Sequence, residues 1–177
     1  MNKINVFPLA KDHLATLSDY SRNRRSIVDY FLFLVLPVVF GGVIVWFGFG
    51  FRSDAVNGFL STFSILVGLL LNLLVLVLTV ASGQAHFSAD TKMRKTLLQQ
   101  IFVNICFAVL VSVVVVITAL VALSYMRSEP GATTGKIATF ILSSFTVNFM
   151  LTMLMILKRM YAAMQREIEK SGSARAA

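Results

Sequence analysis

The sequence contains little of what enzymes and metal proteins use at their active sites. Its 177 residues include one cysteine, two histidines and eight acidic residues. His13 and His86 are far apart in the chain, and no carboxylates cluster with them at the spacing of a metal site. The chain also lacks a glycine-rich phosphate loop and a nucleophile motif with a partner histidine. We therefore expect no enzymatic activity, no cofactor and no metal ion.

Charge is also missing from four long stretches of the chain, which are almost wholly apolar. No Asp, Glu, Lys, Arg or His lies between residues 30 and 51, 58 and 82, 97 and 123, or 137 and 157. At about 1.5 Å per residue, a helix over any of these stretches is long enough to cross a hydrocarbon core of about 30 Å. The sequence therefore predicts an all-α integral membrane protein with four transmembrane helices, at 30–51, 57–82, 97–123 and 137–158, joined by short loops.

The chain divides accordingly into three parts. Residues 1–28 form a cytoplasmic segment, in which 8–26 is predicted to be an amphipathic helix that lies on the membrane or covers a partner. Residues 29–158 form the transmembrane domain. Residues 159–177 continue the fourth helix into the cytoplasm and end in a disordered tail from residue 171.

The basic residues are distributed unevenly, and their positions predict the orientation. Thirteen of the 16 Lys and Arg lie in the N-terminal segment, in the loop between the second and third apolar runs, or after residue 157. Only Arg52, Arg127 and Lys136 lie in the other two loops. By the positive-inside rule both termini are expected in the cytoplasm. Attraction to anionic lipid head groups explains the net charge of +8 without direct nucleic-acid binding.

The two outer loops are too short to bind a soluble protein, so a protein partner is expected on the cytoplasmic side. Two basic groups there are the candidate docking residues. They are Arg22, Arg24, Arg25, Lys92, Arg94 and Lys95.

Small and polar residues within the apolar runs recur at helical spacing and form a stripe on each of three predicted helices. Each stripe contains one asparagine, and the three are expected in a common layer about 10 to 15 Å inside the cytoplasmic boundary. Such stripes serve either as packing and oligomer seams or as the lining of a polar path in an oligomer. The candidate seam residues are Ser61, Ser64, Gly68, Asn72, Asn104 and Asn148.

The basic N-terminal segment ends in SIVDYFLFLVLP, and the second apolar run reads FLSTFSILVGLLLNLLVLVLT. With these stretches and without a soluble domain, the chain resembles the compact four-helix membrane subunits of bacterial antiphage defence systems. It is most similar to the membrane subunit of the Kiwa system. The resemblance implies an inner-membrane homo-oligomer, a tetramer, that works with a cytoplasmic DNA-binding protein to detect or restrain phage infection. It carries no site residues over to this chain.

These observations favour an oligomeric inner-membrane protein that senses or transmits membrane perturbation to a cytoplasmic partner, in antiphage defence. Two alternatives stay open. One is an oligomeric pore that depolarises the membrane, and the other is a structural accessory subunit of a larger complex.

Overall fold

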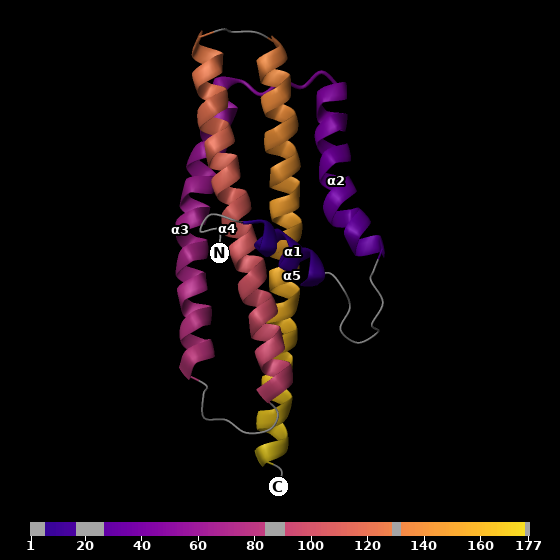
Figure 1. Ribbon diagram of the computed structural model, residues 1–177, viewed down its shortest axis with the longest axis vertical. Coiled ribbons are helices and arrows are strands. Elements are labelled where there is room, and N and C mark those ends of the chain that lie inside the picture. Colours follow the sequence, from indigo (N-terminus) through magenta and orange to yellow (C-terminus); the bar gives the residue numbers. More distant parts are fainter. Residues whose placement is uncertain (1–5, 17–26, 84–90, 129–131, 176–177) are drawn as a thin grey trace.

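A computed structural model of the protein describes residues 6–16, 27–83, 91–128 and 132–175, and these residues fold into five α-helices (Figure 1). The helices are α1 (Phe7–Thr16), α2 (Ile27–Trp46), α3 (Ser53–Gly83), α4 (Thr91–Ser128) and α5 (Ala132–Arg175). The described part of the chain contains no strand, so the all-α class predicted from the sequence is confirmed there.

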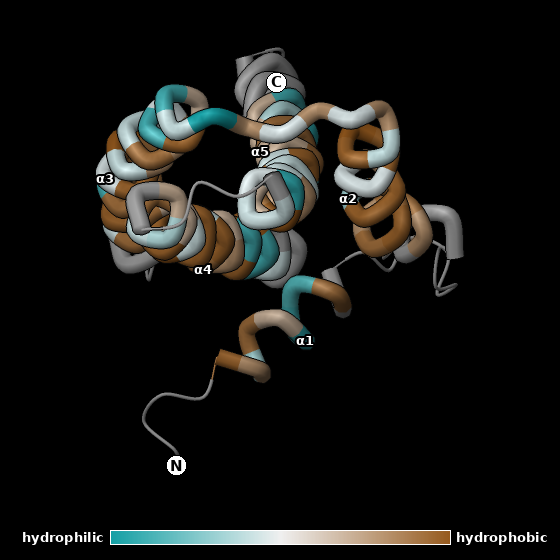
Figure 2. The backbone as a smooth tube through the Cα atoms, turned by 90° about the horizontal axis from the view of Figure 1, so that it is seen from above, coloured by the Kyte–Doolittle hydropathy of each residue, from teal (hydrophilic) through white to brown (hydrophobic). Residues whose placement is uncertain are grey.

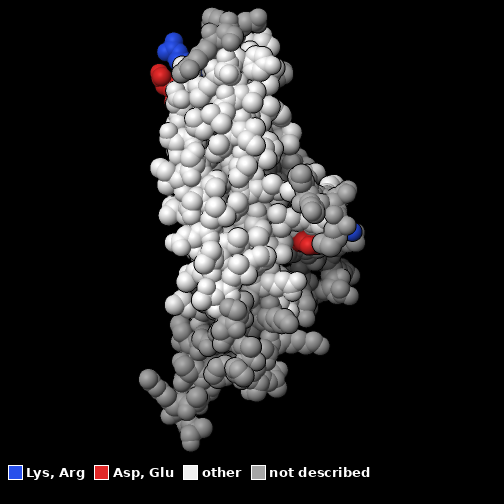
Figure 3. Space-filling view, turned by 60° about the vertical axis from the view of Figure 1, so that its left-hand side comes forward, with Lys and Arg blue, Asp and Glu red and all other residues white. Residues whose placement is uncertain are grey.

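In the described part of the chain, three helices are long and apolar enough to cross a membrane. Their apolar segments are Ser53–Thr79, Leu98–Met126 and Thr133–Ala162, and α2 adds a shorter apolar segment, Phe31–Trp46. In Figure 3 most of the described surface between the charged side chains at the upper end and those at the right-hand edge is uncharged. These features are those of a helical protein embedded in a membrane.

The second helix is shorter than its apolar run, because a glycine ends it. Gly48 has a φ of +80°, a left-handed conformation that side chains other than glycine rarely adopt. The Phe49 N–H bonds to the Ile44 carbonyl at 3.2 Å, and the Gly48 N–H bonds to the Val45 carbonyl at 3.0 Å. These two bonds cap the last turn of α2 in a Schellman arrangement. The predicted helix over 30–51 is therefore wrong beyond Trp46.

The four long helices form an open row in the order α3, α4, α5, α2, rather than a closed ring (Figure 2). Helices α2 and α3 are consecutive in the chain but lie at opposite edges of the row. Residues 47–52 connect them by passing over the start of α5, where the Phe51 N–H donates to Thr139 Oγ1 at 2.6 Å. The short helix α1 lies across α4 (Figures 1 and 2).

The apolar core lies between α3, α4 and α5. Helix α3 contributes Val56, Phe63, Leu70 and Val77, all buried and each seven residues from the next. A seven-residue spacing produces one narrow stripe on a helix, so most of the remaining surface of α3 faces outward. Helix α4 contributes small buried residues, Ala108, Ala119 and Ala122, which allow its neighbours to approach closely.

Two predicted boundaries differ from the structure, and the predicted end of the N-terminal helix at residue 26 lies outside the described residues. Helix α1 ends at Thr16, and residues 17–26 lie outside the described residues. Helix α4 begins at Thr91, so Lys92, Arg94 and Lys95 belong to a helix and not to the loop, as suits the high helix propensity of lysine and arginine. Helix α5 continues to Arg175, beyond the predicted start of a disordered tail, although Gly172 is a poor helix former.

Candidate functional site

The most elaborate polar contact in the described residues joins α1 to α4. The imidazole of His13 is 1% exposed, and its Nδ1 lies 2.9 Å from Asn104 Oδ1. Because an amide oxygen only accepts, the ring carries its proton on Nδ1 and donates it. The same ring stacks on Phe107 with centroids 3.8 Å apart and planes within 7°. One side chain of α1 thus makes both a polar and an aromatic contact with α4.

The other residues of α1 form an amphipathic helix, with its apolar side on the same face as His13. Leu9 and Leu14 are half-buried, whereas Lys11 and Asp12 are exposed. Phe7, at the start of the helix, is 75% exposed. A short helix with a charged outer face and an exposed aromatic residue at its end is suited to the boundary between head groups and hydrocarbon. His13 therefore fastens such a helix to a spanning helix.

His13 also reaches α2 through Phe33. The two rings are arranged edge to face, with centroids 5.8 Å apart. Phe33 lies one turn before Pro37, which has no N–H to bond to the carbonyl of residue 33. Asn148 of α5 replaces that donor, because its Nδ2 donates to the Phe33 carbonyl oxygen at 3.1 Å. Polar side chains of neighbouring helices commonly satisfy carbonyls that a proline leaves open in a membrane.

The electrostatic surroundings keep the imidazole neutral. The pKa of His13 is lowered from its ordinary value of 6.5 to about 4, chiefly by burial and in small part by the positive charge of Arg159 on α5, while the hydrogen bond to Asn104 raises it. At neutral pH the ring is therefore an uncharged hydrogen-bond donor. We call the group formed by His13, Phe33, Asn104, Phe107 and Asn148 the His13 cluster; it joins α1, α2, α4 and α5.

The candidate seam residues of α3 do not belong to the His13 cluster. Ser61, Ser64, Gly68 and Asn72 are all exposed on the outward face of this helix. Ser64 Oγ bonds to its own helix at the Leu60 carbonyl, at 2.7 Å, and a Cβ added at Gly68 would meet nothing within 4 Å. No described residue hydrogen-bonds the Asn72 amide. Among the described residues, no other helix therefore covers these four positions.

The structure brings two of the three predicted asparagines together and leaves the third apart. Asn104 and Asn148 both belong to the His13 cluster, whereas Asn72 lies on the outer face of α3. Arg22, Arg24 and Arg25 lie outside the described residues. Lys92, Arg94 and Lys95 lie in the first turns of α4, and their side chains are also outside the described residues.

The sequence analysis missed His13, Phe33 and Phe107 as site residues. Position 13 follows Leu9 by four residues, which places both on one face of a helix, so the pattern did contain a signal for His13. No sequence signal connected His13 with its partners, because Asn104 is 91 positions away.

Within the described residues no three His, Cys, Asp or Glu side chains gather as a metal ion would require. Comparison with known protein families, with curated proteins and with solved structures finds no match to this chain.

Proposed function

We propose that the protein is an oligomeric inner-membrane protein with four spanning helices and cytoplasmic termini, which senses membrane perturbation and transmits it to a cytoplasmic partner. The 20 residues of α2 extend for about 30 Å, which allows the shorter apolar helix to be the fourth span. The observation that carries the proposal is the burial of His13, which couples an interfacial helix to the spanning helices.

An interfacial helix responds to the bilayer because its apolar face competes for space among head groups and acyl chains. A change in lateral tension or lipid packing alters how deeply such a helix lies. In this protein, α1 cannot move without disturbing His13, and His13 contacts both Asn104 and Phe33. A shift of α1 therefore acts on α4 directly and on α2 next to Pro37.

Helix α5 provides a route from the membrane to the cytoplasm. Its 44 residues extend for about 66 Å, twice the thickness of a hydrocarbon core. Asn148 ties α5 to α2 at Phe33, and the opposite end of the helix runs past Lys158 to Arg175. A change in the His13 cluster is thus transmitted along a continuous helix to a surface that a soluble partner can reach.

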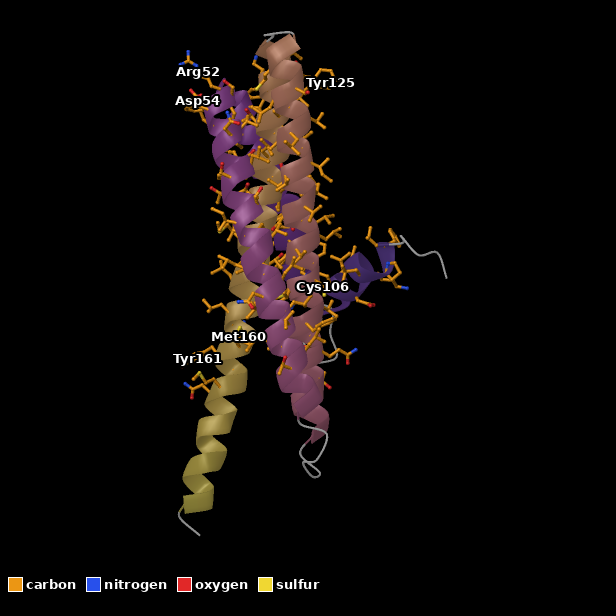
Figure 4. The ribbon with its side chains drawn as sticks, turned by 90° about the vertical axis from the view of Figure 1, so that its left-hand side faces the viewer. Arg52, Asp54, Cys106, Tyr125, Met160 and Tyr161 are labelled. Atoms are coloured by element: carbon orange, nitrogen blue, oxygen red, sulfur yellow. The ribbon has the colours of Figure 1, made fainter. Side chains whose placement is uncertain are left out.

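A fluorophore on α1 tests this proposal. In a Cys106→Ser background, Lys11→Cys provides an exposed attachment site two residues from His13, on the opposite face of α1. In liposomes under osmotic tension we expect the emission of an environment-sensitive dye at this site to shift. His13→Ala should reduce the shift, because α1 is then released before tension is applied. A dye at exposed Tyr125, at the far end of the molecule (Figure 4), serves as the control that should not respond. An unchanged emission from α1 under tension would contradict sensing.

We propose the cytoplasmic partner to be a DNA-binding protein of an antiphage system, which rests on the sequence resemblance alone. Its expected docking residues are the two basic groups at 22–25 and 92–95. Charge reversal of either group should reduce recovery of the partner in pull-downs from detergent while leaving the oligomer intact. Equal recovery with both triple variants would refute cytoplasmic docking at these residues.

The outward stripe of α3 favours a second candidate function, a pore formed by several subunits. An amide such as Asn72 is costly in contact with lipid, so this face needs either a polar path or another helix as its neighbour. Asn72→Leu separates the two. Loss of liposome conductance with an intact oligomer indicates a pore, because a ring of leucines favours dewetting. Weaker assembly indicates a helix contact, and this is the outcome we expect.

A further inference from the structure

Helix α5 carries a second exposed stripe, which is apolar and differs from the stripe of α3. Its members are large side chains that are each between 54% and 67% exposed. They follow one another at intervals of four, three, four and three residues, the spacing at which two helices pack side by side in a coiled coil. We call these residues the α5 seam: Met150, Leu154, Leu157, Tyr161 and Met164.

The seam lies on the side of α5 that its own chain leaves open. Phe149, Thr152 and Ile156 are buried and take the inner side of the same turns. Toward the C-terminal end, α5 diverges from α3 and α4, and Met160 and Tyr161 project away from them (Figure 4). Intramolecular packing therefore does not explain five large apolar residues in this register.

The seam also crosses the membrane boundary. Met150 and Leu154 lie well inside the apolar segment Thr133–Ala162, whereas Met164 lies beyond it and beyond exposed Lys158. Lipid can cover the first part of the stripe but not the last. A soluble partner can cover the last part but not the first.

A second copy of α5 can cover the whole stripe. Two copies in one membrane have the same orientation, so their α5 helices run parallel and in register, as in parallel coiled coils. The next position of the same spacing is Ile168, which extends the register to 19 residues, or about 28 Å of helix. Methionine adapts to irregular contacts, which suits two of the five positions.

We propose that the α5 seam is the contact through which two copies of this chain associate, from within the membrane into the cytoplasm. The contact rests on the oligomer of the proposed function and identifies the helix that forms it. Because the pairing is parallel, each seam residue lies close to the same residue of the other copy.

Cysteine cross-linking in membranes tests the pairing. In the Cys106→Ser background, single variants Tyr161→Cys and Met164→Cys place thiols in the seam, and Ala162→Cys places a matched thiol next to it on an exposed position. Diamide oxidises a thiol pair to a disulfide, taking up two electrons and two protons. We expect both seam variants to form disulfide-linked dimers at least about fivefold faster than Ala162→Cys, because the paired helices hold their thiols at high effective concentration.

The native mass in detergent is measured in parallel for the unoxidised proteins. An oligomer whose seam variants cross-link no faster than Ala162→Cys would overturn the α5 pairing and leave the proposed oligomer standing. A monomer of 19.5 kDa in every sample would overturn both. Disulfide formation to another protein instead of a second copy would also refute the pairing.

Discussion

Two adjacent glycines of α2 have very different surroundings, although the sequence presents them as a pair. A Cβ at Gly41 would overlap Ser144 Oγ and approach the Phe140 carbonyl oxygen to 2.8 Å. A Cβ at Gly42 would meet nothing within 4 Å. Gly41 therefore allows α2 to approach α5 closely, whereas a side chain at position 42 would fit without displacing any neighbour.

Alanine substitution at each glycine measures this difference. Gly41→Ala should destabilise the protein by about 1–3 kcal/mol, because the Phe140 backbone cannot move aside as a flexible side chain can. Gly42→Ala is the matched control and should be neutral or stabilising by up to about 1 kcal/mol, through the better helix propensity of alanine. Thermal unfolding in detergent gives both values. Equal Tm values for the two variants would show that α2 and α5 are not in close contact.

The protonation state of His13 makes the docking of α1 dependent on pH. Its pKa is lowered to about 4 when docked, from an ordinary 6.5, chiefly by burial. Arg159 faces it from α5, and Asn104, Phe107 and Phe33 are its other neighbours. Since the docked state favours the neutral ring, docking is fully stable above pH 6.5 and weakens as the pH falls from 6.5 to about 4.

The Lys11→Cys fluorophore reports this weakening as a shift in emission over the same pH range. His13→Gln retains a hydrogen-bonding side chain but does not titrate, so its curve should be flat where the parent curve changes. The difference between the two curves removes contributions from carboxylates that titrate near pH 4. If the two curves coincide, His13 does not control the docking of α1.

At the residue level, the sequence predicted which residue types would matter but not which of them would meet. Asn72 and Asn104 lie in stripes of similar composition, yet one is exposed and the other is buried against His13. Burial depends on which helix faces each stripe. For Asn104 that neighbour is His13, 91 positions away, which helical spacing within one segment cannot reveal.

At the level of elements, α2 and α5 are joined by a hydrogen bond that exists because of a proline. Pro37 leaves the Phe33 carbonyl without a donor from its own helix, and Asn148 supplies one at 3.1 Å. Pro37→Ala restores the N–H that can bond to this carbonyl. Asn148→Leu should therefore be more destabilising in the parent protein than in the Pro37→Ala protein.

A double-mutant cycle measures this coupling. We expect an interaction free energy of about 0.5–1.5 kcal/mol between the two positions, the typical net value of one hydrogen bond. Thr146→Leu on α5 serves as the control. The Thr146 hydroxyl donates to the Leu142 carbonyl of its own helix, so this substitution should not couple to Pro37. Additive effects of Pro37→Ala and Asn148→Leu would show that the amide does not compensate for the proline.

The apolar runs predicted the long helices well, because the absence of charge over more than 20 residues leaves few alternatives to a spanning helix. They predicted the ends less well. Gly48 stops α2 inside its run by adopting a positive φ, and Lys92 to Lys95 continue α4 outside its run because charged residues remain good helix formers. The hydropathy of a segment indicates whether it lies in lipid or in water, whereas backbone conformation and helix propensity determine where its helix begins and ends.

For the whole molecule, the open row explains why so much apolar surface remains exposed in one chain. Helices α2 and α3 lie at the two edges and have a long helix on only one side, so both carry exposed Leu, Val and Phe side chains along their length. Lipid covers such surfaces without cost, but it does not suit the Asn72 amide or the part of the α5 seam beyond the membrane. These two places are where a neighbouring copy would gain most.

The orientation of the molecule in the membrane is the last prediction. Arg52 and Tyr125 lie at the same end of the bundle, and Met160 and Tyr161 lie toward the other end (Figure 4). Near the end with Arg52 the sequence has only two further basic residues, Arg127 in the last turn of α4 and Lys136 in the first turns of α5, while the other thirteen lie in residues 1–28, between residues 83 and 97, or after residue 157. Because positively charged segments resist translocation, the Arg52 end should face the periplasm.

Reporter fusions test this orientation. A phosphatase that is active only in the periplasm should be silent when fused after Ala177 and active when inserted between residues 128 and 132. A fluorescent protein that matures only in the cytoplasm should give the opposite pattern at the same two sites. Phosphatase activity after Ala177 would show that the molecule has the opposite orientation, with α1 and the C-terminal end of the α5 seam in the periplasm. Helix α1 and the C-terminal end of α5 would then have no access to a cytoplasmic partner, which would contradict the proposed function.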